Sequence, residues 1–421
     1  MIEMNLLEEV AANRLEKTGQ NKKITISGWT SNSWDVYRIP LKFLYYNDKN
    51  GRINTAYKQY QEVNGRLDPE PGDSKYNKIF EKLIYDSNPG ALDDTIRSIK
   101  EKTQQEPGVV LPDGRVIDGN RRLTALRMFQ AEDHIPKDFE AVIIKLDVDS
   151  ENDEKRIKEL ELDLQLGREE RLPYDPIDRI YDVYNTIEVQ KMMTVEEYKK
   201  ASGAGNTKGI NRDIRLANLI LRFIDIVSPG GNPADKFYLA RELKLDGPIE
   251  DIEGTINKLK SSDKESITDA VLAYLAVVKT KEGNVDATRI MRDVKENILN
   301  NDDTIQYFLA AVDDKVDDVY DVFENNPIKN GNDLKQTIQS APELDKSVQE
   351  LCSSVNRLIY KGKKSAERRE ALTELQDIRE SLQEINCDDF KELTQDELLD
   401  AKEALKDIRD IVYKLNEGVM K

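Results

Sequence analysis

The sequence predicts an α+β domain at the N-terminus followed by all-α domains, in a chain that is helix-rich overall. Short apolar runs bounded by turn residues, typical of strands, fall within the first 150 residues. Beyond them, apolar residues recur every three or four positions, as in amphipathic helices. Charged residues make up 34% of the 421 residues, which suits helices with much solvated surface. We expect an α+β domain over 1–150, a connecting helix and helix-turn-helix over 151–232, an acidic helical domain over 233–330, and a heptad-patterned helical bundle or coiled coil over 331–421.

Composition excludes several classes of site. The single histidine, His134, lies in a polar loop, which argues against histidine-based catalytic triads and zinc sites. The two cysteines, Cys352 and Cys387, lack metal-ligand spacing and are expected to be reduced thiols. The net charge of −18 means that any DNA contact has to come from a local basic face. No apolar run approaches the roughly 18 residues of a membrane span, and the first 17 residues read as an acidic amphipathic helix, so we expect a cytoplasmic protein without membrane contact.

Residues 109–129, VVLPDGRVIDGNRRLTALRMF, read as strand, turn, strand and helix. Turn residues 112–114 separate two apolar runs, and helical spacing begins after Gly119. A glycine thus opens a helix that carries Arg121 and Arg122 on its first turn. Backbone N–H groups, the helix dipole and two guanidinium groups make an anion site, for which phosphate is the expected anion. The alternative is an ordinary hairpin–helix corner with an arginine pair on its surface.

The run VIDGNRRLTALR resembles the helix-opening motif of the ParB/sulfiredoxin-like superfamily, written GERRxxA in partition proteins. The matching positions are Gly119, Asn120, Arg121, Arg122 and Ala125. A preceding helical segment with apolar residues at 92, 96 and 99 also resembles the helix that precedes this motif in the superfamily. The resemblance covers about residues 36–225, and it implies a bound nucleotide, CTP or ATP, with Mg²⁺.

Two further segments are similar to superfamily elements that lie near the nucleotide. A strand through Leu44 leads into a polar turn with Asn47, Asn50 and Arg52, and a charged helix follows the strand at 141–147. The alternative for this helix is a plain solvated surface. By resemblance, the catalytic residues are Asp118, Asn120 and Glu161, with Asn120 and Glu161 also holding the metal, and the nucleotide-binding residues are Gly119, Arg121, Arg122, Arg52, Asn47, Gln165 and Arg168.

The sequence also departs from the superfamily. The cysteine that sulfiredoxins carry in this motif is missing, which excludes that activity. Asn120 stands where the kinase-like branch has histidine and partition proteins have glutamate. Because an amide binds Mg²⁺ more weakly than a carboxylate and cannot act as a base, the sequence favours nucleotide binding over fast hydrolysis.

Residues 194–222 predict a helix-turn-helix. Thr194 and Glu197 form a capping box, and a short helix ends at the glycines of 203–205. This segment has six Lys and Arg against three Asp and Glu, a local positive excess. We expect the second helix to contact DNA as a recognition helix, through Thr207, Lys208, Asn211, Arg212 and Arg215. The alternative is a plain helical hairpin.

The C-terminal half has no recognisable resemblance. Residues 301–326 hold eight Asp and Glu against one lysine, and this face would repel DNA, so it is either solvated or bound to a protein partner. Within 344–416, three segments with heptad-like spacing predict three helices in a bundle or antiparallel coiled coil. Both an intramolecular bundle and a homodimer fit this pattern.

Together these features predict a ParB-like, nucleotide-dependent DNA-binding protein of partition or regulatory type, with CTP as the expected nucleotide and hydrolysis of CTP or another NTP left open. Two alternatives remain. One is a ParB-like metal-dependent nuclease or ATPase that uses Asp118 and Glu161. The other is a protein-interaction component of a mobile-element or phage-defence system, in which the acidic helical half binds the partner.

Overall fold

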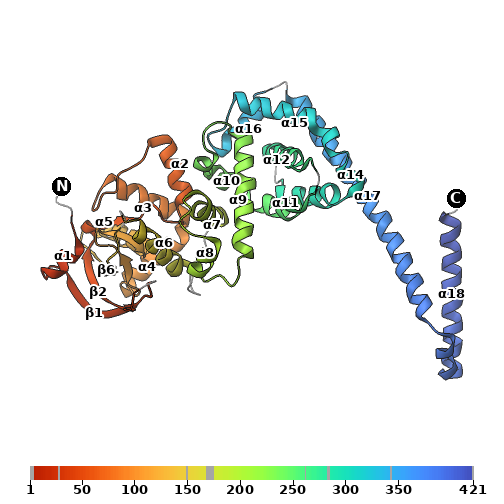
Figure 1. Cartoon of the computed structure of the whole chain (residues 1–421), viewed down its shortest axis with the longest axis horizontal. Helices are drawn as coiled ribbons and strands as arrows, with labels where there is room; N and C mark the ends of the chain where they lie inside the picture. Colours follow the sequence, from red (N-terminus) through yellow and green to blue (C-terminus); the bar gives the residue numbers. More distant parts are fainter. Residues whose placement is uncertain are drawn as a thin grey trace.

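The computed structural model describes residues 4–26, 29–147, 150–166, 175–260, 262–281, 285–341 and 344–419. A sheet domain at the N-terminus is followed by a helical body, and a long helical arm projects from the far side of that body (Figure 1). The prediction of a helix-rich chain with an N-terminal sheet is confirmed. Among the described residues, none of the helices is both long and apolar enough to cross a bilayer.

Within the described residues, the sheet has six strands in the order β1-β2-β6-β4-β5-β3. The pairs β3–β5 and β4–β6 are parallel, whereas β1–β2, β2–β6 and β4–β5 are antiparallel. The strand bounds are β1 Glu16–Lys23, β2 Ser33–Pro40, β3 Tyr45–Tyr46, β4 Gly108–Val110, β5 Arg115–Asp118 and β6 Asp138–Ile143.

Helices cover both faces of this sheet. Successive strand residues point to opposite faces, so Val110 and Val116 pack in one core and Val109 and Ile117 in another. The first core also contains side chains of α1 Leu6–Ala11, α2 Asn54–Asn64, α3 Lys75–Ser87, α4 Pro89–Lys102 and α5 Asn120–Asp133. The second core is covered by α6 Glu151–Leu166.

The start of the chain differs from its prediction. The expected helix through residue 17 ends at Ala11, and β1 begins at Glu16, within the stretch expected to be helical. Asn13, at φ +54°, takes the left-handed conformation that breaks the helix. Strand β1 lies at the edge of the sheet and is exposed along most of its length. It therefore lacks the alternation of apolar residues by which a strand is recognised.

The predicted strand, turn, strand and helix at 109–129 are confirmed as β4, β5 and α5. Gly114 has φ +92°, and a Cβ atom there would lie 2.1 Å from the Phe43 carbonyl oxygen. Glycine is therefore required at this turn. The turn directs β5 so that Asp118 and Gly119 reach the start of α5 at the edge of the sheet domain.

One continuous apolar core runs through the helical body from Ile177 to Leu358. The domain boundaries expected at 232/233 and 330/331 fall inside this core, because side chains from both sides of each boundary pack together. The elements are α7 Pro176–Tyr184, α8 Val195–Ser202, α9 Lys208–Val227, α10 Tyr238–Glu242, α11 Asp246–Lys258, α12 Lys264–Thr280, α13 Ala287–Val294, α14 Asp302–Ile305, α15 Phe308–Asn325 and α16 Gly331–Gln339, with π-helical turns at Asn185–Val189 and Lys295–Leu299.

The helical hairpin expected at 194–222 is present as α8 and α9. Thr194 and Glu197 form the predicted capping box, and Gly203, at φ +70°, ends α8. The C-terminal part of α9 packs against α7, α11 and α12 in the body core.

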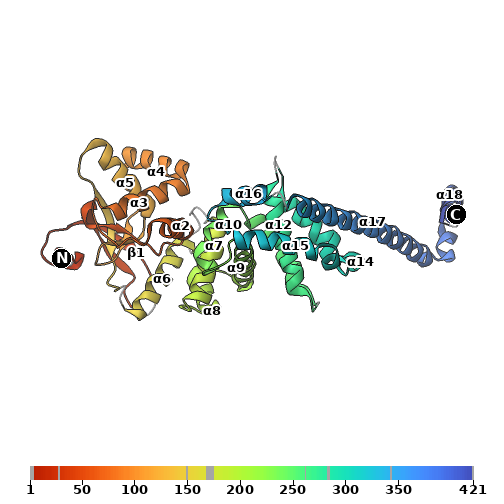
Figure 2. The same ribbon diagram turned by 90° about the horizontal axis from the view of Figure 1, so that it is seen from above.

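The heptad segments form two helices rather than three. Helix α17, Leu344–Glu384, is continuous over 41 residues and contains the first two segments, and α18, Gln395–Val419, is the third. The charged stretch between the first two segments consists mostly of good helix formers, so it continues the helix instead of forming a loop. Helices α17 and α18 meet at the end of the arm and diverge from there (Figures 1 and 2).

Candidate functional site

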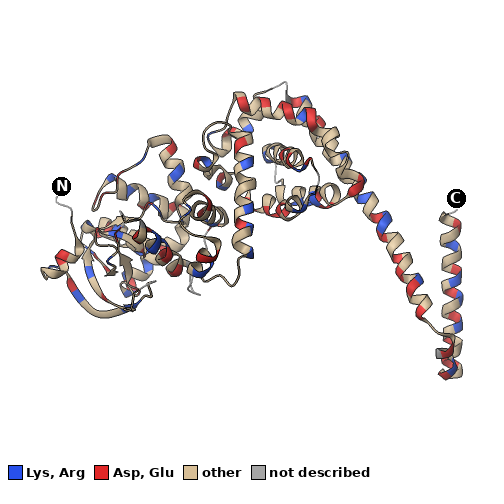
Figure 3. Ribbon diagram, in the orientation of Figure 1, with Lys and Arg blue, Asp and Glu red and all other residues tan. Residues whose placement is uncertain are grey.

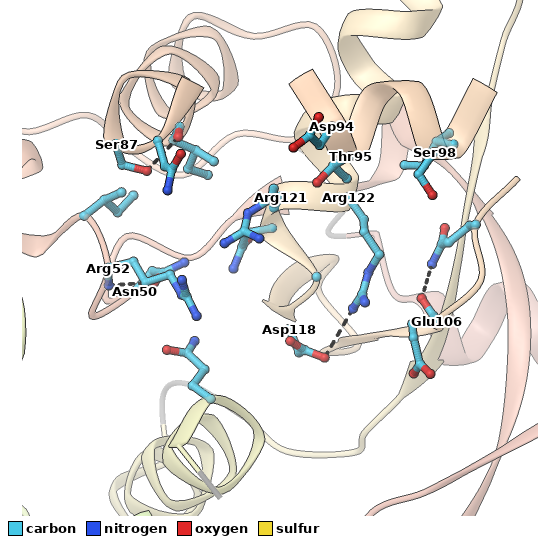
Figure 4. Close-up of a pocket in the computed structure, with 18 of the residues that line it drawn as sticks. Asn50, Arg52, Ser87, Asp94, Thr95, Ser98, Glu106, Asp118, Arg121 and Arg122 are labelled. Carbon is cyan, nitrogen blue, oxygen red and sulfur yellow. Dashed lines mark hydrogen bonds and ion pairs between the residues drawn. The ribbon is translucent and has the colours of Figure 1, made fainter. Parts of the chain in front are cut away.

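A cavity of about 920 Å³ lies where the sheet domain meets the helical body. Its walls come from the start of α5, the loop before α2, helices α3, α4 and α6, and the beginning of α7 with Arg241 of α10. Figure 4 shows this cavity with its lining side chains. Six residues predicted to bind nucleotide or metal line it together with Asp118, which was predicted to be catalytic: Arg52, Gly119, Asn120, Arg121, Arg122 and Gln165.

The start of α5 forms one end of the cavity. Gly119 is the N-cap of α5 and has φ +96°, a conformation that L side chains rarely adopt. A Cβ atom at this position would lie 2.8 Å from Cζ of Phe139 in β6. Glycine has no side chain to cap the helix, and the residues of the first turn of α5 line the cavity at the positive end of the helix dipole.

Three arginines from two segments line this end of the cavity. Arg121 and Arg122 come from the first turn of α5, and Arg52 follows a turn in which its backbone N–H donates to Asn50 Oδ1 at 3.0 Å. In Figure 4, Arg121 lies between the loop that carries Arg52 and the side chain of Arg122. Arg122 Nη2 is 3.4 Å from Asp118 Oδ2, one helical turn back.

Asp118 is held in place by a second cation that the sequence did not reveal. Its Oδ2 atom lies 3.3 Å from Nζ of Lys22 in β1, and both side chains are buried. Lys22 Nζ also donates to the Pro107 carbonyl oxygen. A lysine in a polar strand has no signal in the sequence for such a role. Lys22 and Arg122 therefore both lie beside this carboxylate, which holds the guanidinium of Arg122 at the cavity.

The residues that line the cavity include two with buried amide oxygens. Asn120 Oδ1 and Gln165 Oε1 are both inaccessible to solvent and, among the described residues, have no hydrogen-bond partner. A buried polar atom without a partner costs about 1–3 kcal/mol, so native structures rarely retain one unless a ligand or water satisfies it. A ligand that brings donors or a cation into the cavity would satisfy both acceptors.

Glu161 and Asn47 lie elsewhere than predicted. Both line a smaller cavity of about 260 Å³ on the other side of the loop at 47–52. Glu161 accepts from the Gly51 backbone N–H at 3.1 Å and from Gln165 Nε2 at 3.3 Å, and burial raises its pKa. Glu161 therefore ties α6 to the loop that carries Arg52, and it does not share a cavity with Asn120 as a joint metal site would require.

Asn47 and Arg168 do not join the other predicted residues in the large cavity of the described structure. Asn47 Oδ1 closes its own turn by accepting from the Lys49 backbone N–H at 3.1 Å. Arg168 lies outside the described residues. Among the residues that the structure describes, no group of three or more His, Cys, Asp or Glu side chains is arranged to hold a metal ion.

The far wall of the cavity joins the two parts of the molecule. Asp178 of α7 accepts from the Thr55 hydroxyl of α2, and its Oδ2 atom lies 3.2 Å from Arg241 Nη1 of α10. Asp178 is 1% exposed. Burial raises the pKa of Asp178 to about 7, although Arg241 and Thr55 favour its charged form. The sequence offered no reason to connect these three residues.

The raised pKa of Asp178 makes the free energy of unfolding depend on pH. A carboxyl group whose pKa is higher in the folded state than in the unfolded state weakens folding as pH rises between the two values. For Asp178 that window runs from its ordinary value of 3.8 to about 7. We expect the free energy of unfolding to fall across it by on the order of 4 kcal/mol, at about 1.4 kcal/mol per unit.

Thermal unfolding followed by circular dichroism across this window should show the wild type losing stability relative to Asp178→Asn. Asp86→Asn, at an exposed position on α3, is the matched control and should follow the wild type. Parallel pH profiles for wild type and Asp178→Asn would contradict the assignment.

The predicted DNA-binding residues divide into two groups. Lys208 and Asn211 are exposed at the start of α9, next to half-buried Thr207. Arg215 donates to Glu253 of α11, which is buried, and Arg212 Nη1 lies 3.3 Å from Glu250 Oε1 of the same helix. The two arginines therefore connect α9 to α11. The part of the predicted DNA-binding surface that remains consists of Thr207, Lys208 and Asn211.

Comparisons of the chain with models of protein families, with characterised proteins and with solved structures find no match.

Proposed function

We propose that the cavity at the start of α5 binds the phosphate groups of a nucleoside triphosphate, CTP or ATP, in a ParB-like, nucleotide-dependent DNA-binding protein. The observation that carries this proposal is the convergence of Arg52, Gly119, Arg121 and Arg122 on one cavity, from segments far apart in the chain. The volume of about 920 Å³ lies within the range of small-molecule sites.

The phosphates would bind at the first turn of α5. Backbone N–H groups at a helix N-terminus, together with the positive end of the helix dipole, favour an anion there. Arg121 and Arg122 add planar guanidinium groups, which bind phosphate oxygens in pairs. Arg52, held on the opposite loop, would approach the same phosphates from the other side.

The lining residues also fit a Mg²⁺ ion bound with the phosphates. Magnesium prefers oxygen ligands, and Asn120 Oδ1 and Gln165 Oε1 are buried oxygens that lack a donor within the described part of the chain. The ion would neutralise phosphate charge in a cavity that also contains the carboxylates of Asp94 and Glu106. We propose binding and not fast hydrolysis, because Lys22 and Arg122 neutralise Asp118 and Asn120 cannot act as a base.

A nuclease is supported less well than nucleotide binding. Metal-dependent cleavage by Asp118 and Glu161 would need both carboxylates near the same ion. Asp118 lines the large cavity, whereas Glu161 lines the small one and hydrogen-bonds to the Gly51 backbone.

The nucleotide would connect the sheet domain to the DNA-binding part. One wall of the cavity belongs to α5, and the opposite wall includes Asp178 and Arg241 of the helical body. Helix α7, which carries Asp178, packs against α9, which carries Lys208 and Asn211. A ligand that bridges the two walls would bias the position of α9 relative to the sheet domain.

Thermal unfolding in the presence of CTP, ATP or GTP, each with Mg²⁺, tests this proposal. A ligand that binds only the folded state raises the melting temperature in proportion to its affinity. We expect a concentration-dependent increase with at least one of the three nucleotides and a smaller one with inorganic phosphate. No increase with any of the three would refute the proposal.

DNA binding is tested separately at the start of α9. We expect Lys208→Ala combined with Asn211→Ala to weaken binding to duplex DNA roughly 10-fold, because one phosphate contact and one base-edge contact are lost. The matched control is Asn332→Ala with Lys335→Ala on α16, where the same two residue types are exposed three positions apart. Fluorescence anisotropy at fixed salt measures both. Equal affinities for the two double variants would contradict the assignment of α9.

A further inference from the structure

Exposed apolar side chains are concentrated in the arm, defined here as residues 357–419. Of the eighteen large hydrophobic residues that are exposed among the described residues, twelve lie between positions 372 and 419. On α18, Leu405, Val412 and Leu415 are each about half exposed, and no described residue of this helix is buried. A contiguous exposed apolar surface of this kind marks an interaction site.

The spacing of these residues indicates that the partner is another helix. On α18 the apolar positions 398, 401, 405, 408, 412 and 415 alternate steps of three and four, which is the pattern of a coiled-coil seam. On α17 the positions 372, 375, 378 and 382 form a similar stripe, which Ile385 continues directly after the helix ends at Glu384. Because the two helices touch only near the end of the arm, neither stripe covers the other (Figures 1 and 2).

Charge divides the arm into two ends of opposite sign. The base of the arm, residues 357–369, has six Lys and Arg against one Glu. The tip, residues 384–400, has seven Asp and Glu against one Lys. Figure 3 shows acidic residues gathered along the ribbon where α17 meets α18. Two basic residues of the base, Lys363 and Arg369, pair with Asp293 and Asp303 of the body, and the base remains positive after these pairs are subtracted.

The apolar stripes of α17 and α18 could be buried by three helix pairings. The opposite charges of base and tip disfavour two of them. If α18 folded back along α17 of its own chain, the acidic start of α18 would lie along the acidic end of α17. If two arms paired side by side in the same direction, the two acidic tips would meet. If two arms pair in opposite directions, each acidic tip lies along the basic base of the other arm, so that opposite charges meet at both ends.

We propose that two copies of this chain form a homodimer through their arms, with the arms antiparallel and the tip of each arm beside the base of the other. The lengths agree with this arrangement. At 1.5 Å per residue, the distance along α17 from base to tip is about 30 Å, and α18, with 25 residues, is about 38 Å long. A single α18 helix is therefore long enough to span the distance from tip to base. It can lie along the whole length of the partner's arm.

The oligomeric state of the full-length chain, measured by light scattering after size-exclusion chromatography, tests the interface. We expect a dimer for the wild type and a monomer for Leu405→Glu, which places a charge in the stripe. Leu399→Glu is the matched control, because Leu399 is also an exposed leucine of α18 but lies outside the stripe, and this variant stays dimeric. A wild type that is monomeric, as it would be with α18 folded onto its own α17, overturns the proposal.

The direction of pairing is tested by thiol cross-linking. Cys387 is an exposed free cysteine at the tip, and Ala366 is exposed at the base. In a Cys352→Ser background, a bis-maleimide should join Cys387 of one copy to the thiol introduced by Ala366→Cys in the other, giving a covalent dimer. Mass spectrometry of mixed ¹⁴N and ¹⁵N chains identifies the joined peptides as intermolecular.

Without Ala366→Cys, the same reagent should leave the protein as single chains. A Cys387–Cys387 cross-link in that background would show that the tips lie together and would overturn the antiparallel arrangement. A cross-link found only within one chain would overturn the dimer as well.

Discussion

Arg121→Ala is expected to weaken nucleotide binding by about 10- to 100-fold, since a hydrogen bond to a charged group contributes about 1.5–3 kcal/mol. Arg121 lines the large cavity and lies between Arg122 and the loop that carries Arg52. Its replacement removes a guanidinium from the proposed phosphate site without removing the ion pair between Arg122 and Asp118. The variant should lose most of the nucleotide-dependent increase in melting temperature, and circular dichroism without nucleotide measures any change in its own stability.

The control for this variant is Arg156→Ala on α6. Arg156 is partly exposed, pairs with Asp153 one turn back, and does not belong to the lining of the large cavity. Arg121→Lys separates charge from geometry, because lysine keeps the charge but cannot form the paired contact of a guanidinium. We expect its affinity to fall between those of the wild type and Arg121→Ala. A nucleotide response that Arg121→Ala leaves intact would show that the phosphates bind elsewhere.

Gly119→Ala is expected to destabilise the sheet domain by about 2–5 kcal/mol. An L residue in the left-handed region costs roughly 1–2 kcal/mol, and overpacking a core adds about 1–3 kcal/mol. At Gly119 both costs apply, because φ is +96° and the new methyl group would lie 2.8 Å from the Phe139 ring. The ring belongs to β6 in the middle of the sheet, so it has little room to move.

Gly19→Ala separates these two contributions. Gly19 lies in β1 with φ +82°, but a Cβ atom there meets nothing within 4 Å, so only the backbone cost should appear. Both tryptophans of the chain, Trp29 and Trp34, pack on the sheet domain, and their fluorescence during urea unfolding therefore reports on that domain. Equal losses of stability at the two glycines would mean that the Phe139 ring moves aside. The close packing at Gly119 would then add nothing to the cost of the substitution.

Much of the candidate site could be predicted because its signals are local. The apolar run, turn glycine, second apolar run and helical spacing of 109–129 each depend on neighbours within a few positions, and all four elements form where expected. The capping box at Thr194 and Glu197 is of the same kind. Such patterns are set by backbone conformation and side-chain spacing, so they survive in whatever tertiary structure the chain adopts.

The remaining contacts could not be predicted, because they join residues that nothing in the sequence relates. Lys22 reaches Asp118 from an edge strand, and Thr55, Asp178 and Arg241 meet from three different helices. Glu161 appeared to be a metal ligand, yet its carboxylate is directed to the Gly51 backbone. The direction in which a side chain points across an interface depends on how whole elements pack.

The order of residues alone specified the glycine-led helix, its two arginines and the strands that precede it, since each of these depends on the conformational preferences of a few adjacent residues. Packing between distant elements decided which charges lie in the cavity, which arginines of α9 are tied to α11, and that the two stripes of the arm stay uncovered within one chain. Burial and Coulomb interactions act through space, so the partners of a charged or apolar side chain are determined only once the chain has folded.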